Sequence, residues 1–143
     1  MKKQPIDIFR EARHAIDPVL AQHGFSFQEG TSGPSSGGEY ASGAYVNGNR
    51  KLELHYRSSL GLVTYHFDKA SLDHTAYMRV LLGDKGGNKY PGFSDDPVAA
   101  FESLAYDLEH FATAFLEGNF EEFARIVTTA EAWNKIPGFA RLP

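Results

Sequence analysis

The chain has no cysteine among its 143 residues. Disulfide bonds, thiolate nucleophiles and cysteine-ligated zinc are therefore excluded, and the composition fits a reducing compartment. The chain also has no run near the roughly 18 consecutive apolar residues that a membrane-spanning helix needs. Its N-terminal stretch, MKKQPIDIFREARHA, does not contain the apolar segment of a secretory signal. We therefore expect a cytoplasmic protein with no membrane partner.

Basic charge is scarce as well. The 14 Lys and Arg residues are scattered along the chain and outnumbered by 18 Asp and Glu residues, which gives a net charge of −4. A nucleic-acid-binding protein needs a basic face to meet the phosphates. The sequence therefore predicts no nucleic-acid partner, and it is compatible with a basic or neutral protein partner.

Apolar and aromatic side chains, by contrast, are abundant. Hydrophobic residues make up 42% of the chain and aromatic residues 13%, which is enough for a packed interior along most of its length. A chain of this size buries roughly 70% of the surface that it exposes when unfolded, and it matches the usual size of one domain. We expect a single domain covering residues 1–143.

The strongest local pattern lies between residues 50 and 68, where apolar and polar residues alternate as in a β-hairpin. If Ser58 to Gly61 form the loop, the inward pairs are Leu52 with Phe67, Leu54 with Tyr65 and Tyr56 with Val63. The outward pairs are then Lys51 with Asp68, Glu53 with His66, His55 with Thr64 and Arg57 with Leu62. Opposite or complementary polar groups facing each other across strands favour this register. The sequence predicts a hairpin with one buried and one polar face.

Periodicity and capping residues predict the remaining elements. Helices are expected at residues 6–23, 71–82, 97–117 and 119–133, and short strands at 25–28 and 40–46. Pro18 should kink the first helix or restart it with Asp17 as N-cap, and Ser71, Asp96 and Asn119 should cap the later ones. The stretch TSGPSSGG, residues 31–38, is expected to be an irregular loop. The turn at residues 47–49 leaves open whether Tyr45 or Val46 points inward.

This order of elements predicts an α+β fold. The expected architecture is an antiparallel sheet of three to four strands with helices packed on one face, in the order α-β-β-β-β-α-α-α. The other face of the sheet would be exposed to water or would meet a partner.

Six histidines raise the question of a metal site. His55, His66 and Glu53 would share the polar hairpin face, where two imidazoles and a carboxylate could converge. Zinc sites need three or four ligands, however, and no H-x-H or H-E-x-x-H spacing occurs in the chain. We interpret these residues as ordinary cross-strand pairs and predict no metal.

The other histidines have structural interpretations. His74 falls in the apolar arc of helix 71–82, so we expect it to be buried with one hydrogen-bond partner. A general base would also need a pocket and a substrate pose, and the alternative is such a pocket formed by Tyr65, His74 and Tyr77. Asp107 and His110 are three residues apart on the side of helix 97–117 that we take to be polar, and they should form a solvated pair.

One nucleophile motif matches by letter. Gly33 to Gly37 spell G-x-S-x-G around Ser35, but a nucleophile elbow needs a strand before it and a helix after it. The Gly-rich pieces SGPSSGG and DKGGNK lack the Lys-Ser/Thr ending of a phosphate-binding loop. The sequence therefore predicts no catalytic residue and no cofactor.

The connection at residues 84–96 is long for a compact domain and carries KYPGFSDD near its end. Its glycine half should be mobile, while Tyr90, Pro91 and Phe93 should lie against the body of the protein. Tyrosines are also frequent interface residues, so Tyr90 and Phe93 are candidate contacts for a partner.

The runs YRSSLGLVTYHF, HTAYMRVLLG, YPGFSDDP and FESLAYDLEHFATAFLEG, together with the overall layout, resemble small uncharacterised bacterial proteins often found near polymorphic toxins. Some proteins of that type are immunity proteins, which are single α+β domains that bind and block a cognate toxin. The resemblance covers nearly the whole chain. It implies a binding role and carries over no catalytic residue.

These observations favour a non-catalytic bacterial binding protein of the immunity type that sequesters a macromolecular partner, as a monomer or a homodimer. The predicted contact residues lie on the polar hairpin face and in the 84–96 connection: Glu53, His55, Arg57, His66, Tyr90 and Phe93. The alternative is a small-ligand-binding protein or an enzyme, with a pocket between the sheet and helix 71–82 near His74 and Tyr77.

Overall fold

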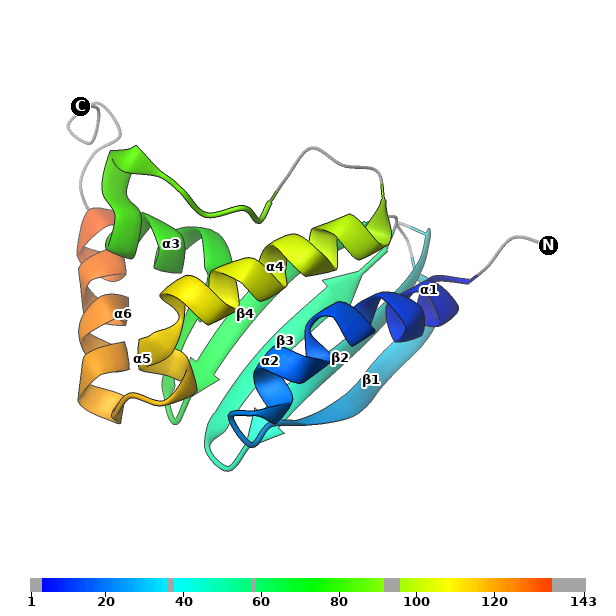
Figure 1. Cartoon of the computed structure of the whole chain (residues 1–143), viewed down its shortest axis with the longest axis horizontal. Coiled ribbons are helices and arrows are strands. Elements are labelled where there is room, and N and C mark those ends of the chain that lie inside the picture. The colour runs from blue at the N-terminus through cyan, green and yellow to red at the C-terminus, as the bar shows by residue number, and fades with distance from the viewer. Residues whose placement is uncertain (1–3, 36–37, 58, 92–95, 135–143) are drawn as a thin grey trace.

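The computed structural model describes residues 4–35, 38–57, 59–91 and 96–134. Helices precede and follow a run of strands (Figure 1). The elements in chain order are α1 (Pro5–Ala12), η1 (Arg13–Ala15), α2 (Asp17–Ala21), β1 (Ser26–Ser35), β2 (Gly38–Asn47), β3 (Arg50–Tyr56), β4 (Leu60–Phe67), β5 (Ala70–Asp73), α3 (His74–Leu82), η2 (Gly83–Lys85), α4 (Pro97–Phe111), α5 (Thr113–Leu116) and α6 (Phe120–Asn134). The α+β prediction is confirmed, with five strands in place of three to four.

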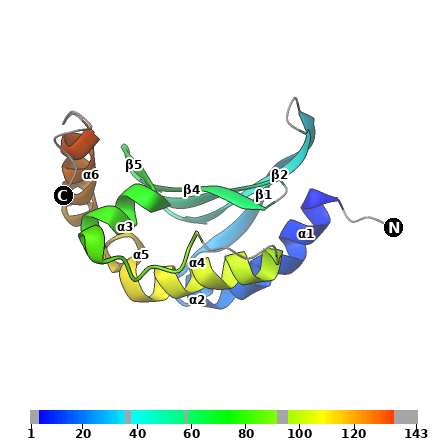
Figure 2. The same ribbon diagram turned by 90° about the horizontal axis from the view of Figure 1, so that it is seen from above.

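The strands form one antiparallel sheet in the order β1-β2-β3-β4-β5, so each strand pairs with its neighbours in the chain. α1, α2, α4 and α5 lie on one face of this sheet, and α3 and α6 stand at the β5 end (Figure 2). No helix of the described chain covers the other face, toward which the sheet curves at both ends (Figure 2). We call this the open sheet face.

The register of the β3–β4 hairpin differs from the prediction by two residues. Leu52 pairs with Tyr65 and Leu54 pairs with Val63. Because side chains alternate with a period of two, this shift leaves the predicted inward residues on the inner face. The predicted register was wrong because Leu60 is not part of the loop: it is buried, belongs to β4 and pairs with Tyr56.

A bulge absorbs the extra residue that this pairing creates. The register changes between Leu54 and Tyr56, so Gly61 and Leu62 together oppose His55. Bulges of this kind bend a strand and leave the extra residue unpaired. Leu62 is 64% exposed, whereas Val63 beside it is 2% exposed.

The prediction of an irregular loop is wrong for residues 31–35 and 38, and residues 36 and 37 lie outside the described residues. β1 continues through this stretch to Ser35, which pairs with Gly38 at the start of β2. The Gly- and Ser-rich composition lowers strand propensity, but pairing with β2 overrides it. Ser35 therefore ends a strand that returns as another strand, and the helix that a nucleophile elbow requires does not follow it.

The β2–β3 turn settles the question that the sequence left open. Asn47 pairs with Arg50, so the loop holds only Gly48 and Asn49, and Gly48 adopts a positive φ of 58°. A two-residue loop places Tyr45 on the inner face, where it is 2% exposed. Val46 is half-buried on the other face.

The first helix is interrupted near Pro18, as predicted, but Asp17 is not the N-cap of the helix that follows. α1 ends at Ala12, a 3₁₀ turn follows, and α2 begins at Asp17. The Asp17 carboxylate makes no capping bond; it accepts from Arg13 Nη1 at 2.9 Å and from the Tyr45 hydroxyl. The carboxylate ties this helical segment to β2, which is why it does not serve as the cap.

The predicted N-cap of the third helix, Ser71, is two residues early. Ser71 lies in β5 opposite His66, and α3 begins at His74 with Asp73 as N-cap, whose carboxylate accepts from Ala76 N at 2.8 Å. The sequence analysis missed β5 because a tight turn after Phe67 extends the hairpin by one more strand. The caps at Asp96 and Asn119 are confirmed by hydrogen bonds from Val98 N and Glu122 N.

The long helix predicted to end near residue 117 is interrupted. α4 ends at Phe111 and α5 begins at Thr113. At the break, Phe115 N–H donates to the Tyr77 hydroxyl at 3.2 Å instead of to a carbonyl one turn earlier. This side-chain acceptor satisfies the amide that the break frees.

The buried apolar side chains form one cluster between the sheet and the helices. Two polar side chains of the described residues are buried with it, His74 at 2% and Asp107 at 0% exposure. Burying polar groups costs free energy unless they are hydrogen-bonded, so their partners decide what they do.

Candidate functional site

A chain of buried polar groups joins three elements of the fold. The Tyr65 hydroxyl from β4 lies 2.7 Å from Nδ1 of His74, the first residue of α3. Nε2 of His74 lies 2.9 Å from Oδ2 of Asp107 in α4. All three side chains are buried. A carboxylate only accepts hydrogen bonds, so Nε2 is the donor to Asp107.

Asp107 also holds the segment that enters the 84–96 connection. Its Oδ1 accepts from Lys89 N at 2.7 Å and its Oδ2 from Tyr90 N at 2.8 Å. Two backbone donors and one imidazole therefore compensate this buried carboxylate. The prediction that Asp107 forms a solvated pair with His110 is wrong. His110 is exposed and contacts the Tyr106 carbonyl instead.

The hydroxyl at the end of this chain of groups is not accessible to a substrate. A carboxylate, an imidazole and a hydroxyl in series is an arrangement that can activate a nucleophile. Here the Tyr65 hydroxyl is fully buried, and burial raises its pKa well above the ordinary value, so it keeps its proton. Both ring nitrogens of His74 are engaged. The three residues clamp β4, α3 and α4 together.

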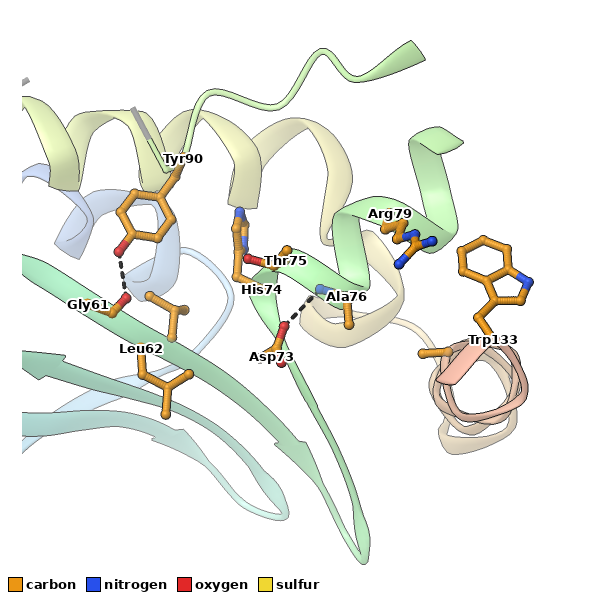
Figure 3. A pocket seen from close by; sticks show the side chains of 11 residues that line it. Gly61, Leu62, Asp73, His74, Thr75, Ala76, Arg79, Tyr90 and Trp133 are labelled. Atoms are coloured by element: carbon orange, nitrogen blue, oxygen red, sulfur yellow. Dashed lines mark hydrogen bonds between the residues drawn. The ribbon is translucent and has the colours of Figure 1, made fainter. Parts of the chain in front are cut away.

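A groove opens beside this clamp, with a volume of about 340 Å³. Figure 3 shows it between the first residues of β4, the start of α3 and the end of α6. The lining residues are Gly61, Leu62, Val63, Asp73, His74, Thr75, Ala76, Arg79, Tyr90, Ala130 and Trp133. Arg79 lies over the Trp133 ring, 5.5 Å from its centroid, at the α6 end of the groove. Arg79 and Asp73 supply its cationic and carboxylate groups.

Tyr90 closes the opposite end of the groove. It is 6% exposed, and its hydroxyl donates to the carbonyls of Leu60 and Gly61, at 2.6 Å each. Burial raises the pKa of this hydroxyl to about 12, so it remains a donor at neutral pH. The prediction that Tyr90 pins the connection to the body is confirmed. Phe93, its predicted companion, lies outside the described residues.

The other residues of the alternative pocket do not reach the groove. Tyr77 is fully buried and, like Tyr65, is absent from the groove lining. Its hydroxyl accepts from Phe115 N, and burial raises its pKa above the ordinary value. His74 alone of the predicted trio borders the groove.

The open sheet face carries most of the predicted contact residues. His66 Nε2 lies 2.5 Å from Glu53 Oε1, although His66 is directly opposite Lys51, so the pair is diagonal rather than direct. His55 stacks on Tyr40, with ring centroids 5.4 Å apart and planes within 5°. Arg57 lies at the β3–β4 turn, where its N–H donates to the Ser59 carbonyl. The structure thus places His55 and His66 in separate pairs.

Sequence reasoning missed the acid of the clamp and most of the groove. Asp107 follows Leu104 by three residues and precedes Phe111 by four, which places it beside the apolar stripe of α4. That spacing was a usable sign of burial. The contribution of Trp133 and Arg79 had no such sign, because they come together only through the packing of α6 against α3.

In the described part of the chain, no three His, Asp or Glu side chains are placed to hold a metal ion. No helix among those residues has the length and apolar character to cross a membrane. Comparisons of the chain with protein-family models, with curated proteins and with solved structures found no match.

Proposed function

We propose that the chain is a non-catalytic bacterial binding protein that acts in the cytoplasm, as immunity proteins do, by sequestering a macromolecular partner. The observation that carries this proposal is the open sheet face, which no described helix covers (Figure 2). A face of this kind either remains hydrated or meets another molecule. Its curvature suits a convex protein surface, and the net charge of −4 favours a basic or neutral one.

The side chains on this face suit reversible recognition. Glu53 and His66 form a half-exposed pair, and the Tyr40–His55 stack presents aromatic surface beside it. Aromatic groups and adaptable polar groups are the usual contacts of protein interfaces. The buried clamp supports the same proposal, because its histidine has no free ring nitrogen with which to act on a substrate.

A pair of matched variants tests the proposed function. The protein is tagged, cross-linked in its native cells and purified with its partner, and the partner is then titrated by calorimetry. Glu53→Arg should weaken binding more than about tenfold, because it reverses a charge at the centre of the contact. Glu109→Arg makes the same change at an exposed position on α4 and should leave the affinity within about twofold.

An immunity role predicts one further result. Expression of the identified partner alone should inhibit growth. Co-expression of the wild-type chain should restore growth, whereas co-expression of the Glu53→Arg variant should not. A partner whose affinity responds equally to both variants would contradict binding through the open sheet face.

A second candidate function is ligand binding in the groove, as a small-ligand-binding protein or an enzyme would require. The volume of about 340 Å³ and its mixture of apolar and charged walls favour binding there. The engaged nitrogens of His74 argue for binding over reaction at this place.

A further inference from the structure

Two opposite charges at α3 border the groove, and neither has an ionic partner among the described residues. Asp73 and Arg79 both line it. The Arg79 guanidinium contacts the Trp133 ring, and no described carboxylate pairs with it. Asp73 accepts from Ala76 N through Oδ1 alone, although a carboxylate has capacity for further donors. The groove therefore offers one cation and one anion to a ligand.

The geometry of α3 brings these two charges to the same stretch of the groove. Asp73 precedes Arg79 by six residues, which is about 9 Å along a helix axis. Long side chains of a helix lean toward its N-terminus, so Arg79 extends back toward Asp73. A small molecule that carries both an ammonium and a carboxylate group can therefore meet both side chains. A molecule with a carboxylate alone would leave Asp73 facing a like charge.

The end of the groove away from Trp133 is apolar. Figure 3 shows Leu62 and Tyr90 at that end, with Asp73 between them and Arg79. Leu62, 64% exposed, is the most exposed large hydrophobic side chain of the described residues. The Tyr90 hydroxyl is already engaged with two carbonyls, so this end offers apolar contact. An apolar group that covers Leu62 removes its surface from water, which favours binding.

The size of the groove restricts the ligand further. Its volume of about 340 Å³ lies at the small end of the range of ligand pockets, which is about 300–1,000 Å³. Small size, two opposite charges and one apolar contact are together the properties of a single amino acid.

We propose that the groove binds a free α-amino acid with an apolar side chain. The carboxylate of the ligand pairs with Arg79, its ammonium group pairs with Asp73, and its side chain covers Leu62. The inference deepens the second candidate function, ligand binding in the groove, and rests on it. It does not depend on the open sheet face.

The chain carries its own reporter for this binding. Trp133 is the single tryptophan of the sequence and lies at the groove against Arg79. L-leucine, which does not absorb where tryptophan is excited, is titrated into the full-length chain. We expect a saturable change in fluorescence and matching heats in calorimetry, with a dissociation constant below about 1 mM. Absence of saturable binding by L-leucine, L-methionine and L-phenylalanine would overturn the proposal.

Analogues of leucine separate its three contacts. Glycine lacks the side chain, 4-methylpentanoate lacks the ammonium group and 3-methylbutylamine lacks the carboxylate. Each should bind more than about tenfold more weakly than L-leucine, because each leaves one part of the groove without its partner. Equal affinity of 4-methylpentanoate and L-leucine would overturn the recognition of an amino acid and leave ligand binding in the groove intact.

Three variants place the binding. Asp73→Asn keeps a side chain that can cap α3 but removes the charge, so it should weaken L-leucine about tenfold and 4-methylpentanoate by less than about twofold. Arg79→Gln should weaken both compounds about tenfold. Arg125→Gln removes an exposed charge on α6 that does not line the groove and should change neither affinity by more than about twofold. Equal effects of Arg79→Gln and Arg125→Gln would overturn the proposal.

A fragment screen distinguishes failure of this proposal from failure of the candidate function on which it rests. Neutral and anionic fragments are screened by the same Trp133 fluorescence. If fragments bind and amino acids do not, the proposal alone is overturned. If nothing binds, ligand binding in the groove is contradicted as well.

Discussion

The two faces of the sheet use the same pair of chemical groups in opposite ways. On the helix-covered face, His74 contacts Asp107 at 2.9 Å, and both side chains are buried. On the open face, His66 contacts Glu53 at 2.5 Å, and their side chains are 32% and 50% exposed. Water screens the outer pair and leaves it free to exchange partners, while the inner pair is shielded from water and held in place by further hydrogen bonds from Tyr65, Lys89 and Tyr90. The same imidazole and carboxylate thus build a rigid joint inside and an adaptable contact outside.

The largest difference between the two faces is expected when the same charge is placed on each of them. Leu54→Lys places a charge at a 2% exposed position of the inner face, and it should cost more than about 4 kcal/mol of unfolding free energy or prevent folding. Thr64→Lys adds the same charge on the outer face, opposite Glu53, and should cost less than about 1 kcal/mol. Urea denaturation measures both. Similar losses would show that the assignment of the faces is wrong.

Removal of the inner carboxylate should have the next largest effect. Asp107→Ala leaves the His74 ring and the amides of Lys89 and Tyr90 without their acceptor, so we expect a loss of about 3–5 kcal/mol. Glu109→Ala, an exposed change in the same helix, should cost less than about 0.5 kcal/mol. Denaturation midpoints of the two variants provide the measurement. A small loss for Asp107→Ala would mean that the clamp contributes little to stability.

Removal of a single hydroxyl from a buried or an exposed tyrosine should have a smaller effect on stability. Tyr90→Phe removes the donor to the carbonyls of Leu60 and Gly61 and should cost about 1–2 kcal/mol. Tyr40→Phe removes a hydroxyl that donates to Thr31 Oγ1 at 2.9 Å on an exposed part of the sheet, and it should cost less than about 0.5 kcal/mol. Thermal unfolding of both variants gives the difference. The reverse order would contradict the anchoring role of Tyr90.

The outer pair should show the smallest effect. Glu53→Gln should change the unfolding free energy by about 0–1 kcal/mol, because an exposed hydrogen-bonded pair gains little over hydration. A double-mutant cycle with His66→Gln isolates the coupling, which should shrink in about 1 M salt. A coupling as large as that of the inner pair would remove the distinction between the faces.

Local patterns predicted what depends on neighbours in the chain. Alternation alone placed Leu52, Leu54 and Tyr56 on the inner face, because a strand turns successive side chains to opposite sides. The register needed more information, since a shift of two residues preserves that alternation. Whether Leu60 joins the strand or the loop depends on its burial against residues far along the chain, which local spacing does not contain.

In the candidate site, too, local patterns predicted burial but not the contacts with residues distant in the chain. The apolar arc of α3 correctly indicated that His74 is buried. Its acceptor, Asp107, lies 33 residues later, and the hydrogen bonds that compensate that carboxylate come from yet another segment. Nothing in the spacing near Asp107 identifies those donors. The groove likewise results from the point at which β5 ends, and the sequence analysis did not identify β5 as a strand.

The outer edges of the sheet bear on solubility at high concentration. An exposed strand edge is a template on which further chains can polymerise. Along β1, the bulge between Glu29 and Ser32 interrupts the regular ladder, and Pro34 has no amide hydrogen to offer a neighbour. At the opposite edge, β5 is only four residues long and α6 stands beside it (Figure 2). Both ends of the meander therefore carry features that disfavour growth of the sheet by the addition of further chains.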